Sequence, residues 1–362
     1  MVGTTRPVYL LEFAVLNAVG DSVAALYGPA PTAQALEFAP DRLGFPLPAL
    51  RLPTDRFDRK LQRSVEAQSL RLLHCAARLS PNLEALGLPP ERVALTAAIP
   101  EVDAPSPGWE SVAAMRRQPG QWLAQWFANT PPLHSLTMLN SSCMAYIAET
   151  LNCRGPMAGY CGQESAGLDA LIEASHCIAE GRADAALVVS TSPNITPALF
   201  LREVDLEEGT TSLVPGEGAA ACLLAAEPAK SNVNKVRIAG YGRGYLPAST
   251  QTGVCHLDTL ACVLNQVLLC ECLSLSDLIA VWSDPDDEIL CAALNNFPVR
   301  AGSRPLVGAL GASSLLTDLA YALAAPEFAT MEQTRYLLLL NRSYTGHVSA
   351  LLLAVELVGS AP

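Results

Sequence analysis

Residues 155–194 read GPMAGYCGQESAGLDALIEASHCIAEGRADAALVVSTSPN. Apolar side chains recur with the 3.6-residue period of a helix after the bend at 161–165, which predicts a strand, a sharp turn and then a long helix. Gly181 suits the left-handed position that ends a helix, and 183–189 reads as a buried strand. Many enzymes present a nucleophile at such a turn, yet the side chain at the helix start here is Glu164. The positions that share the helical face are Leu168, Leu171, Ile172, Ser175, Cys177 and Ile178.

The chain repeats this kind of pattern twice. Each half begins with an apolar strand, continues through a long helix and a short β-rich run to a bend followed by a helix and a strand, and closes with a hairpin-like strand. The paired segments are 8–15 with 236–241, 64–79 with 257–273, 93–99 with 278–282, 162–190 with 308–341, and 219–226 with 349–357. Alternating helices and apolar strands predict an α/β fold with covered sheets, and the repetition predicts an internal pseudo-twofold.

The polar, Pro-containing stretch 227–234 is the expected boundary between the halves. We therefore divide the chain into residues 1–230 and 231–362, two halves fused into one core. The Pro-rich stretch 30–56 reads as an excursion from the first half.

Composition narrows the function classes. Half of the 362 residues are apolar, 16% are charged and the mean hydropathy is +0.26, so much surface is expected to be hidden in a wide core and at a subunit interface. A net charge of −12 argues against a nucleic-acid-binding protein or a polybasic membrane surface. The first residues read as a strand rather than a signal peptide, and no apolar run is long enough to span a bilayer.

The 11 cysteines do not read as a disulfide framework, because their count is odd and most lie in apolar runs. Reduced core thiols in a cytoplasmic protein are the expectation. Cys270 and Cys272 stand too close in sequence for a usual zinc knuckle, and no second pair accompanies them. We expect no metal and no cofactor.

With these motifs in place, the chain resembles the β-ketoacyl synthase branch of the thiolase fold. Gly155-Pro156, the tight turn and the Gly-Arg-Ala-Asp run at 181–184 stand with that family's spacing. Residues 213–220 resemble its Gly-Glu-Gly-Ala segment, and 341–346 resemble a degraded form of its C-terminal Gly-rich loop. The resemblance implies duplicated α/β/α/β/α layers.

The resemblance also implies three catalytic positions, and none holds the expected residue. Condensation on a thioester needs a low-pKa thiolate at a helix start and two histidines that stabilise an enolate. Glu164 stands at the cysteine's place, Asp284 at the first histidine's place and Ala309 at the second's. A carboxylate attacks thioesters weakly, so we expect an inactive homologue. The alternative for Glu164 is purely structural, since an acid in the first helical turn stabilises the helix by about 0.3–1 kcal/mol.

Among relatives of this kind, the resemblance points to a chain length factor of type II polyketide or aryl polyene systems. Such a subunit forms a heterodimer with a Cys-bearing ketosynthase and elongates chains on acyl carrier protein. This sequence departs from the aromatic polyketide group, which usually carries Gln where Glu164 stands. The residues expected at the partner interface or tunnel are His134, Met138, Ser142, Ile147, Met157 and Tyr160. Ordinary core packing is the alternative for the helical positions 138, 142 and 147.

Two other functions remain open from the sequence. One is an acyltransferase or malonyl decarboxylase that uses Cys161 or Glu164, although Cys161 is expected inside the strand, three residues early. The other is a homodimeric protein that binds acyl thioesters. His347 resembles the family's Gly-His, but it is expected in the last hairpin, well past Gly308.

Overall fold

In the computed structural model of the chain, the residues described are 6–52, 56–100, 107–130, 139–197, 199, 214–228, 234–246, 253–284, 287–294, 297–326, 333–343 and 346–357. The strands are β1 (Tyr9–Leu16), β2 (Gln34–Leu36), β3 (Ala39–Gly44), β4 (Val93–Ala98), β5 (Met157–Tyr160), β6 (Ala185–Thr191), β7 (Ala219–Ala225), β8 (Asn234–Tyr245), β9 (Leu278–Ser283), β10 (Val299–Ala301), β11 (Arg335–Arg342) and β12 (His347–Leu357). The α-helices are α1 (Arg59–Ser64), α2 (Ala67–Arg78), α3 (Ser80–Ala85), α4 (Pro107–Arg117), α5 (Trp122–Asn129), α7 (Asn140–Leu151), α8 (Glu164–Ala179), α10 (Gly253–Leu269), α11 (Glu288–Ala293), α12 (Arg304–Val307) and α13 (Ser314–Leu323).

Ten strands form one hydrogen-bonded sheet whose two halves have the same internal order. The first half runs β5-β4-β6-β7-β1 and the second runs β10-β9-β11-β12-β8. In both halves the first three strands are parallel and the last two are antiparallel to their neighbours. The halves meet where β1 and β8 pair antiparallel over two residue pairs, Tyr9 with Arg237 and Leu10 with Val236. The observed order is the duplicated arrangement with an internal pseudo-twofold that the sequence predicts.

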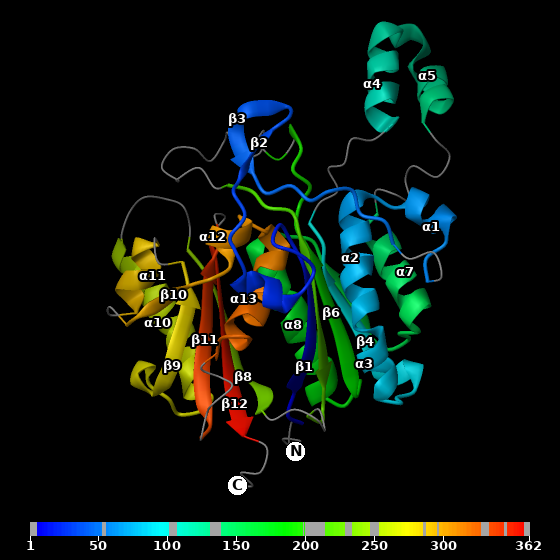
Figure 1. Cartoon of the computed structure of the whole chain (residues 1–362). Coiled ribbons are helices and arrows are strands. Elements are labelled where there is room, and N and C mark those ends of the chain that lie inside the picture. The colour runs from blue at the N-terminus through cyan, green and yellow to red at the C-terminus, as the bar shows by residue number, and fades with distance from the viewer. Residues whose placement is uncertain are drawn as a thin grey trace.

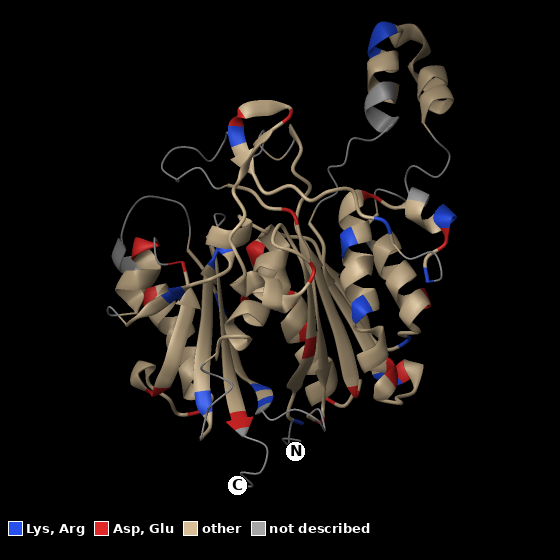
Figure 2. Cartoon of the chain, viewed as in Figure 1, with Lys and Arg blue, Asp and Glu red and all other residues tan. Residues whose placement is uncertain are grey.

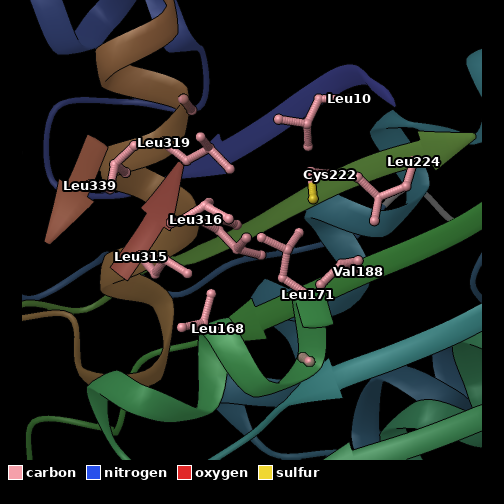
Figure 3. Packing of buried hydrophobic residues seen from close by; sticks show 14 of the residues in the cluster. Leu10, Leu168, Leu171, Val188, Cys222, Leu224, Leu315, Leu316, Leu319 and Leu339 are labelled. Atoms are coloured by element: carbon pink, nitrogen blue, oxygen red, sulfur yellow. The ribbon is translucent and has the colours of Figure 1, made fainter. Parts of the chain in front are cut away.

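Two helices, α8 and α13, lie in the middle of the molecule (Figure 1). α8 contacts β4 and β6 of the first half and β11 and β12 of the second, while α13 contacts β7, β1 and β11. Figure 3 shows Leu168 and Leu171 of α8 beside Leu315, Leu316 and Leu319 of α13. Every residue of β6 and β7 is buried, as expected for strands covered on both faces.

The backbones of the two central helices approach closely at Gly167. A Cβ atom at this position would lie 2.8 Å from the carbonyl oxygen of Ala312 and 3.4 Å from Cβ of Leu315. Only glycine fits such an approach without displacing the neighbouring turn.

Outer helices complete the layers. α2 packs on β6 and β7, with α7 against α2, and α10 packs on β8 and β12, with α11 against α10. The order of layers is therefore α/β/α/β/α, the thiolase-type architecture. Two smaller pieces stand off this body in Figure 1: the two-stranded β2–β3 sheet within the predicted 30–56 excursion, and a hairpin of α4 and α5.

Several boundaries differ from the sequence prediction. The helix predicted at 64–79 is α2, which begins only at Ala67 because the chain is extended at Val65 and Glu66. The helix predicted at 257–273 is α10, four residues earlier, and the chain reverses after it with Cys272 in the left-handed region (φ 55°). The proposed division between 230 and 231 falls outside the described residues, so it stays a prediction.

The cysteine prediction is only partly right. No disulfide joins the cysteines of the described ranges, and Cys75, Cys143, Cys153, Cys177 and Cys222 are buried. Others that the apolar runs predicted to be core thiols, Cys262, Cys270 and Cys272, are exposed, because they lie on the solvent side of α10 and in the turn that follows.

Candidate functional site

The start of α8 holds Glu164 as its first residue, as the sequence predicts. Gln163 is the N-cap residue, but its side chain accepts no capping hydrogen bond. Glu164 as a whole is half-buried, but its Oε2 atom is closed to solvent and has no hydrogen-bond partner among the residues that the structure describes. The carboxyl group therefore points inward rather than toward solvent.

Burial raises the pKa of the Glu164 carboxyl, and this effect outweighs the lowering by its own backbone N–H and by Arg304. Among the residues that the structure describes, the groups that act on its pKa are its own backbone N–H and Arg304. Burial of this kind disfavours the charged form of a carboxyl group relative to water. The site differs in this respect from an activated nucleophile, which needs a base or a cation that stabilises its charged form.

Asp284 follows directly after β9 and forms an ion pair with Arg304, whose Nη1 lies 2.6 Å from Oδ2 of Asp284. Arg304 is the first residue of α12. A third carboxyl group, Asp318 of α13, accepts hydrogen bonds of 2.6 Å from the backbone N–H and the hydroxyl of Ser303. Burial raises the pKa of Asp318, and Asp284 raises it further while Arg304 lowers it. One guanidinium thus acts on three carboxyl groups.

Ala309 lies between α12 and α13, held by its backbone. Its N–H donates to the carbonyl of Val214 at 2.8 Å, and its carbonyl accepts from the N–H of Gly216 at 2.9 Å. Two residues on, the backbone of Gly311 approaches Gln163 so closely that a Cβ atom would lie 2.8 Å from Oε1 of Gln163. The segment 303–311 therefore contacts Asp284 through Arg304 and approaches Gln163, next to Glu164, through Gly311, and a methyl group at Ala309 can move no proton.

A buried ion pair between Arg71 and Glu217 connects the loops beside this site. Nη2 of Arg71 on α2 lies 2.7 Å from Oε1 of Glu217, and both side chains are almost fully buried. Arg71 also donates to Ser192 at 3.3 Å and to Asn194 at 2.9 Å. The carboxylate of Glu217 accepts from the backbone N–H of Leu47 at 2.8 Å and of Ile195 at 3.0 Å. The pair links α2 to three separate backbone segments.

Sequence reasoning missed Arg304 and Arg71. The only sequence feature that could have identified Arg304 is a cation placed shortly before the bend at Gly308. Arg71 carries a clearer one, because it sits on a helical face whose neighbours Leu72, Leu73 and Cys75 are wholly buried.

The predicted interface residues have different fates. Met157 is 55% exposed and Tyr160 is half-buried, both on β5 at the edge of the sheet. Ser142 is half-buried on α7. Ile147 is fully buried in the core cluster that joins α7 to α2, the alternative considered from the sequence, and we leave it out of the proposed interface. His134 and Met138 lie outside the described residues.

The prediction that Cys161 lies within the strand is wrong. β5 ends at Tyr160, so Cys161 falls in the exposed bend between the strand and α8. His347 begins β12 in the last hairpin, as expected, with its ring 5.1 Å from that of Tyr245. Nε2 of His176, at the far end of α8, hydrogen-bonds with the hydroxyl of Tyr241.

Within the described ranges, no cluster of three or more His, Cys, Asp or Glu side chains is arranged to hold a metal ion. None of the described helices combines the length and the apolar character needed to cross a bilayer.

Comparison with known proteins places this site in a fold. No family model and no curated protein matches the sequence. The β-ketoacyl synthase from Burkholderia phymatum STM815 is similar with a TM-score of 0.74 at 16% identity, covering 98% of this chain and 100% of that one. The ishigamide ketosynthase/chain length factor is similar with a TM-score of 0.73 at 17% identity and the same coverage.

The chain has the β-ketoacyl synthase fold. A third structure of this fold, a type II polyketide synthase acyl-carrier protein in complex with its ketosynthase, is similar with a TM-score of 0.73 at 14% identity, covering 98% of this chain and 100% of that one. In this ketosynthase-like chain, the start of α8 carries a buried carboxyl group, and the positions around it carry an ion-paired aspartate and an alanine.

Proposed function

We propose that the chain is the non-catalytic chain length factor subunit of a cytoplasmic heterodimer. Its partner is a Cys-bearing ketosynthase, and together they elongate a polyketide or aryl polyene chain on acyl carrier protein. The observation that carries this proposal is Glu164, an inward-pointing carboxyl group at the start of α8 in place of a thiol. A carboxyl group is a poor nucleophile toward a thioester, so the proposal assigns the chemistry to another subunit.

An open sheet edge supports the existence of a partner. β5 is the last strand of the sheet and pairs only with β4 among the described strands. The carbonyls of Pro156 and Tyr160 accept from β4, so the backbone groups of Met157 and Gly159 point to the open side. An edge with free donors, free acceptors and an exposed Met157 is a template for pairing with another chain.

The α4–α5 hairpin supports the same conclusion. Its two helices pack mainly on each other and stand off the body in Figure 1. One side of α5 exposes four large apolar side chains, Trp122, Leu123, Trp126 and Phe127, with Phe127 74% exposed. The hairpin is inserted in the chain between β4 and α7. Short helices with an uncovered apolar face need a docking partner for stability.

Co-expression with a Cys-bearing ketosynthase encoded beside the gene tests the proposal. Native mass spectrometry should give a one-to-one complex, and Met157→Lys should weaken it because a lysine on the edge strand opposes pairing. The matched control is Leu269→Lys, since Leu269 is similarly apolar and 69% exposed but lies on α10 in the other half. A chain that is dimeric alone and ignores the ketosynthase would favour the homodimeric acyl-thioester-binding function and refute ours.

The enzyme alternative makes an opposite prediction. If Cys161 were the nucleophile, thiol-directed acyl labelling of the purified chain would modify it, and Cys161→Ser would abolish turnover of malonyl-loaded carrier. If Glu164 were a decarboxylase residue, the isolated chain would release CO2 and Glu164→Ala would stop it. Our proposal expects neither activity from the isolated chain.

A further inference from the structure

A row of titratable side chains lies on the central helix α8. Charged residues are few along the strands of the body in Figure 2, where most of the colour falls at strand ends, in loops and on outer helices. α8 nevertheless carries Asp169, Glu173 and His176 at spacings of four and three residues, which puts them on one side of the helix. All three are half-buried, while the apolar residues between them lie in the core cluster. The central helix therefore exposes one polar side.

The strand β8 contributes the side chains that face this row. Its positions 240, 242 and 244 are glycines on which α10 packs, and a Cβ atom at any of them would approach α10 to 3.0 Å or less. The alternate residues Tyr241 and Arg243 therefore point to the opposite face of the strand, toward α8. Nη1 of Arg243 lies 2.5 Å from Oδ1 of Asp169, and the hydroxyl of Tyr241 hydrogen-bonds with Nε2 of His176.

Tyr160, the last residue of β5, joins this surface to the open edge of the sheet. Burial raises the pKa of its phenol, the carboxylates of Glu173 and Asp169 raise it further, and Arg243 lowers it. α8 also packs directly on β5. The α8 polar surface, as we call it, consists of Tyr160, Asp169, Glu173, His176, Tyr241 and Arg243. It is continuous with the β5 edge, where the proposed function places the ketosynthase.

The ion pair of this surface is accessible to a partner. The side chain of Arg243 is 57% exposed and that of Asp169 is 23% exposed. An ion pair in contact with solvent contributes little to the stability of a fold. Charges at the rim of an interface instead steer association and help to fix which partner binds. The position of the pair beside an open strand edge therefore suits recognition of another subunit.

The charge of the α8 polar surface disfavours a second copy of this chain as that subunit. In a twofold pair both copies would carry Asp169 and Glu173 beside the shared edge, and like charges placed together oppose pairing. The net charge of −12 acts in the same direction. A ketosynthase that presents hydrogen-bond donors or cations to the two carboxylates, and an acidic group to Arg243, meets no such repulsion.

We propose that the α8 polar surface selects a ketosynthase subunit over a second copy of this chain. The inference rests on the proposed function for the identity of the partner. Asp169 and Arg243 are the residues that determine this selectivity, because they present opposite charges side by side next to the β5 edge.

The test exchanges the two charges without breaking their ion pair. Asp169→Arg/Arg243→Asp keeps a guanidinium opposite a carboxylate, so the melting temperature should stay that of the wild type, but the charge pattern shown to a partner is reversed. A limiting amount of tagged ketosynthase is mixed with equal amounts of the variant and wild-type chains, and mass spectrometry of the recovered complex gives their ratio. The wild type should be enriched about tenfold at low ionic strength, and the enrichment should shrink above about 0.15 M salt.

The matched control is Asp21→Arg/Arg78→Asp, which exchanges another ion pair. Nη1 of Arg78 on α2 lies 2.6 Å from Oδ2 of Asp21 in the segment after β1, and the two side chains are 42% and 53% exposed. Neither residue acts on the pKa of Tyr160 at the β5 edge. The control variant should therefore compete equally with the wild type for the ketosynthase.

Equal recovery of the wild type and of Asp169→Arg/Arg243→Asp would overturn the inference while leaving the proposed function in place. A change confined to self-association of the isolated chain, measured by analytical ultracentrifugation, would also overturn it, because the surface would then contact a second copy. If the wild type recovers no ketosynthase at all, the proposed function fails and this inference fails with it.

Discussion

Removing Glu217 should cost more stability than almost any other single change to a polar residue. Its carboxylate forms an ion pair with Arg71 at 2.7 Å and accepts hydrogen bonds from the backbone N–H groups of Leu47 and Ile195 at 2.8 and 3.0 Å. Glu217→Ala leaves a guanidinium that is 5% exposed with two neutral hydrogen-bond acceptors, Ser192 and Asn194, and only the electrostatic effect of Glu66 in place of its ion pair. Breaking a buried ion pair in this way costs about 3–5 kcal/mol of the free energy of unfolding.

Burial lowers the pKa of Arg71 more than Glu217 raises it, so the attraction to Glu217 offsets only part of the desolvation of the guanidinium. The double variant Arg71→Met/Glu217→Leu should therefore be less destabilised than the sum of the single variants, since it removes both partners of the pair together. Urea denaturation followed by circular dichroism, with linear extrapolation to water, gives each free energy of unfolding. If Glu217→Ala lowers the free energy of unfolding by less than about 1 kcal/mol, this ion pair does not stabilise the loops as we infer.

Three further predictions concern stability. Because burial raises the folded-state pKa of Glu164, the contribution of this group to stability is greatest below the unfolded pKa of about 4.3 and is lost as pH rises through the folded value. The melting temperature of Glu164→Gln should therefore exceed that of the wild type increasingly with pH, and parallel curves would contradict this. Arg92 and Arg6 lower the pKa of Asp184, whose side chain is 29% exposed, so Asp184→Asn should lower the free energy of unfolding by about 1–2 kcal/mol at neutral pH. This loss should vanish as pH falls from the unfolded pKa of about 3.9 through the lower folded value. A loss that persists in acid would argue against the ion pairs. Gly167→Ala should cost about 1–3 kcal/mol through the clash with Ala312, whereas the control Gly120→Ala, with nothing within 4 Å, should change stability by less than about 0.5 kcal/mol in the same denaturation assay.

The layers of the fold follow from local patterns that the sequence carries in full. The period of Leu168, Leu171 and Ile178 predicts α8, and the fully apolar run 185–191 predicts a strand covered on both faces. The strand order agrees with the prediction because the two halves repeat the same succession of elements. The ends of α10 could not be predicted from its apolar run, since the left-handed turn at Cys272 carries no glycine signal.

Motif spacing predicts Glu164, Asp284 and Ala309 as the positions of lost catalytic residues, and that assignment stays a prediction. The structure pairs Arg304 with Asp284 and brings it close enough to Glu164 to lower the pKa of that carboxyl group. Arg304 and the Arg71–Glu217 pair could not be found in this way, because their partners are distant in sequence and depend on tertiary packing. The α4–α5 hairpin was not predicted either, since an amphipathic period identifies a helix by the face it buries and this chain buries little of α5.

The position of α8 has a consequence for synthesis on the ribosome. This helix leaves the exit tunnel with the first half, yet part of the surface that encloses it, from α13, β11 and β12, is translated near the end of the message. The nascent chain must carry an apolar helix with one side bare for most of the second half's translation. Until α13, β11 and β12 are complete, this bare face is an apolar surface on which the nascent chain can aggregate or bind a chaperone.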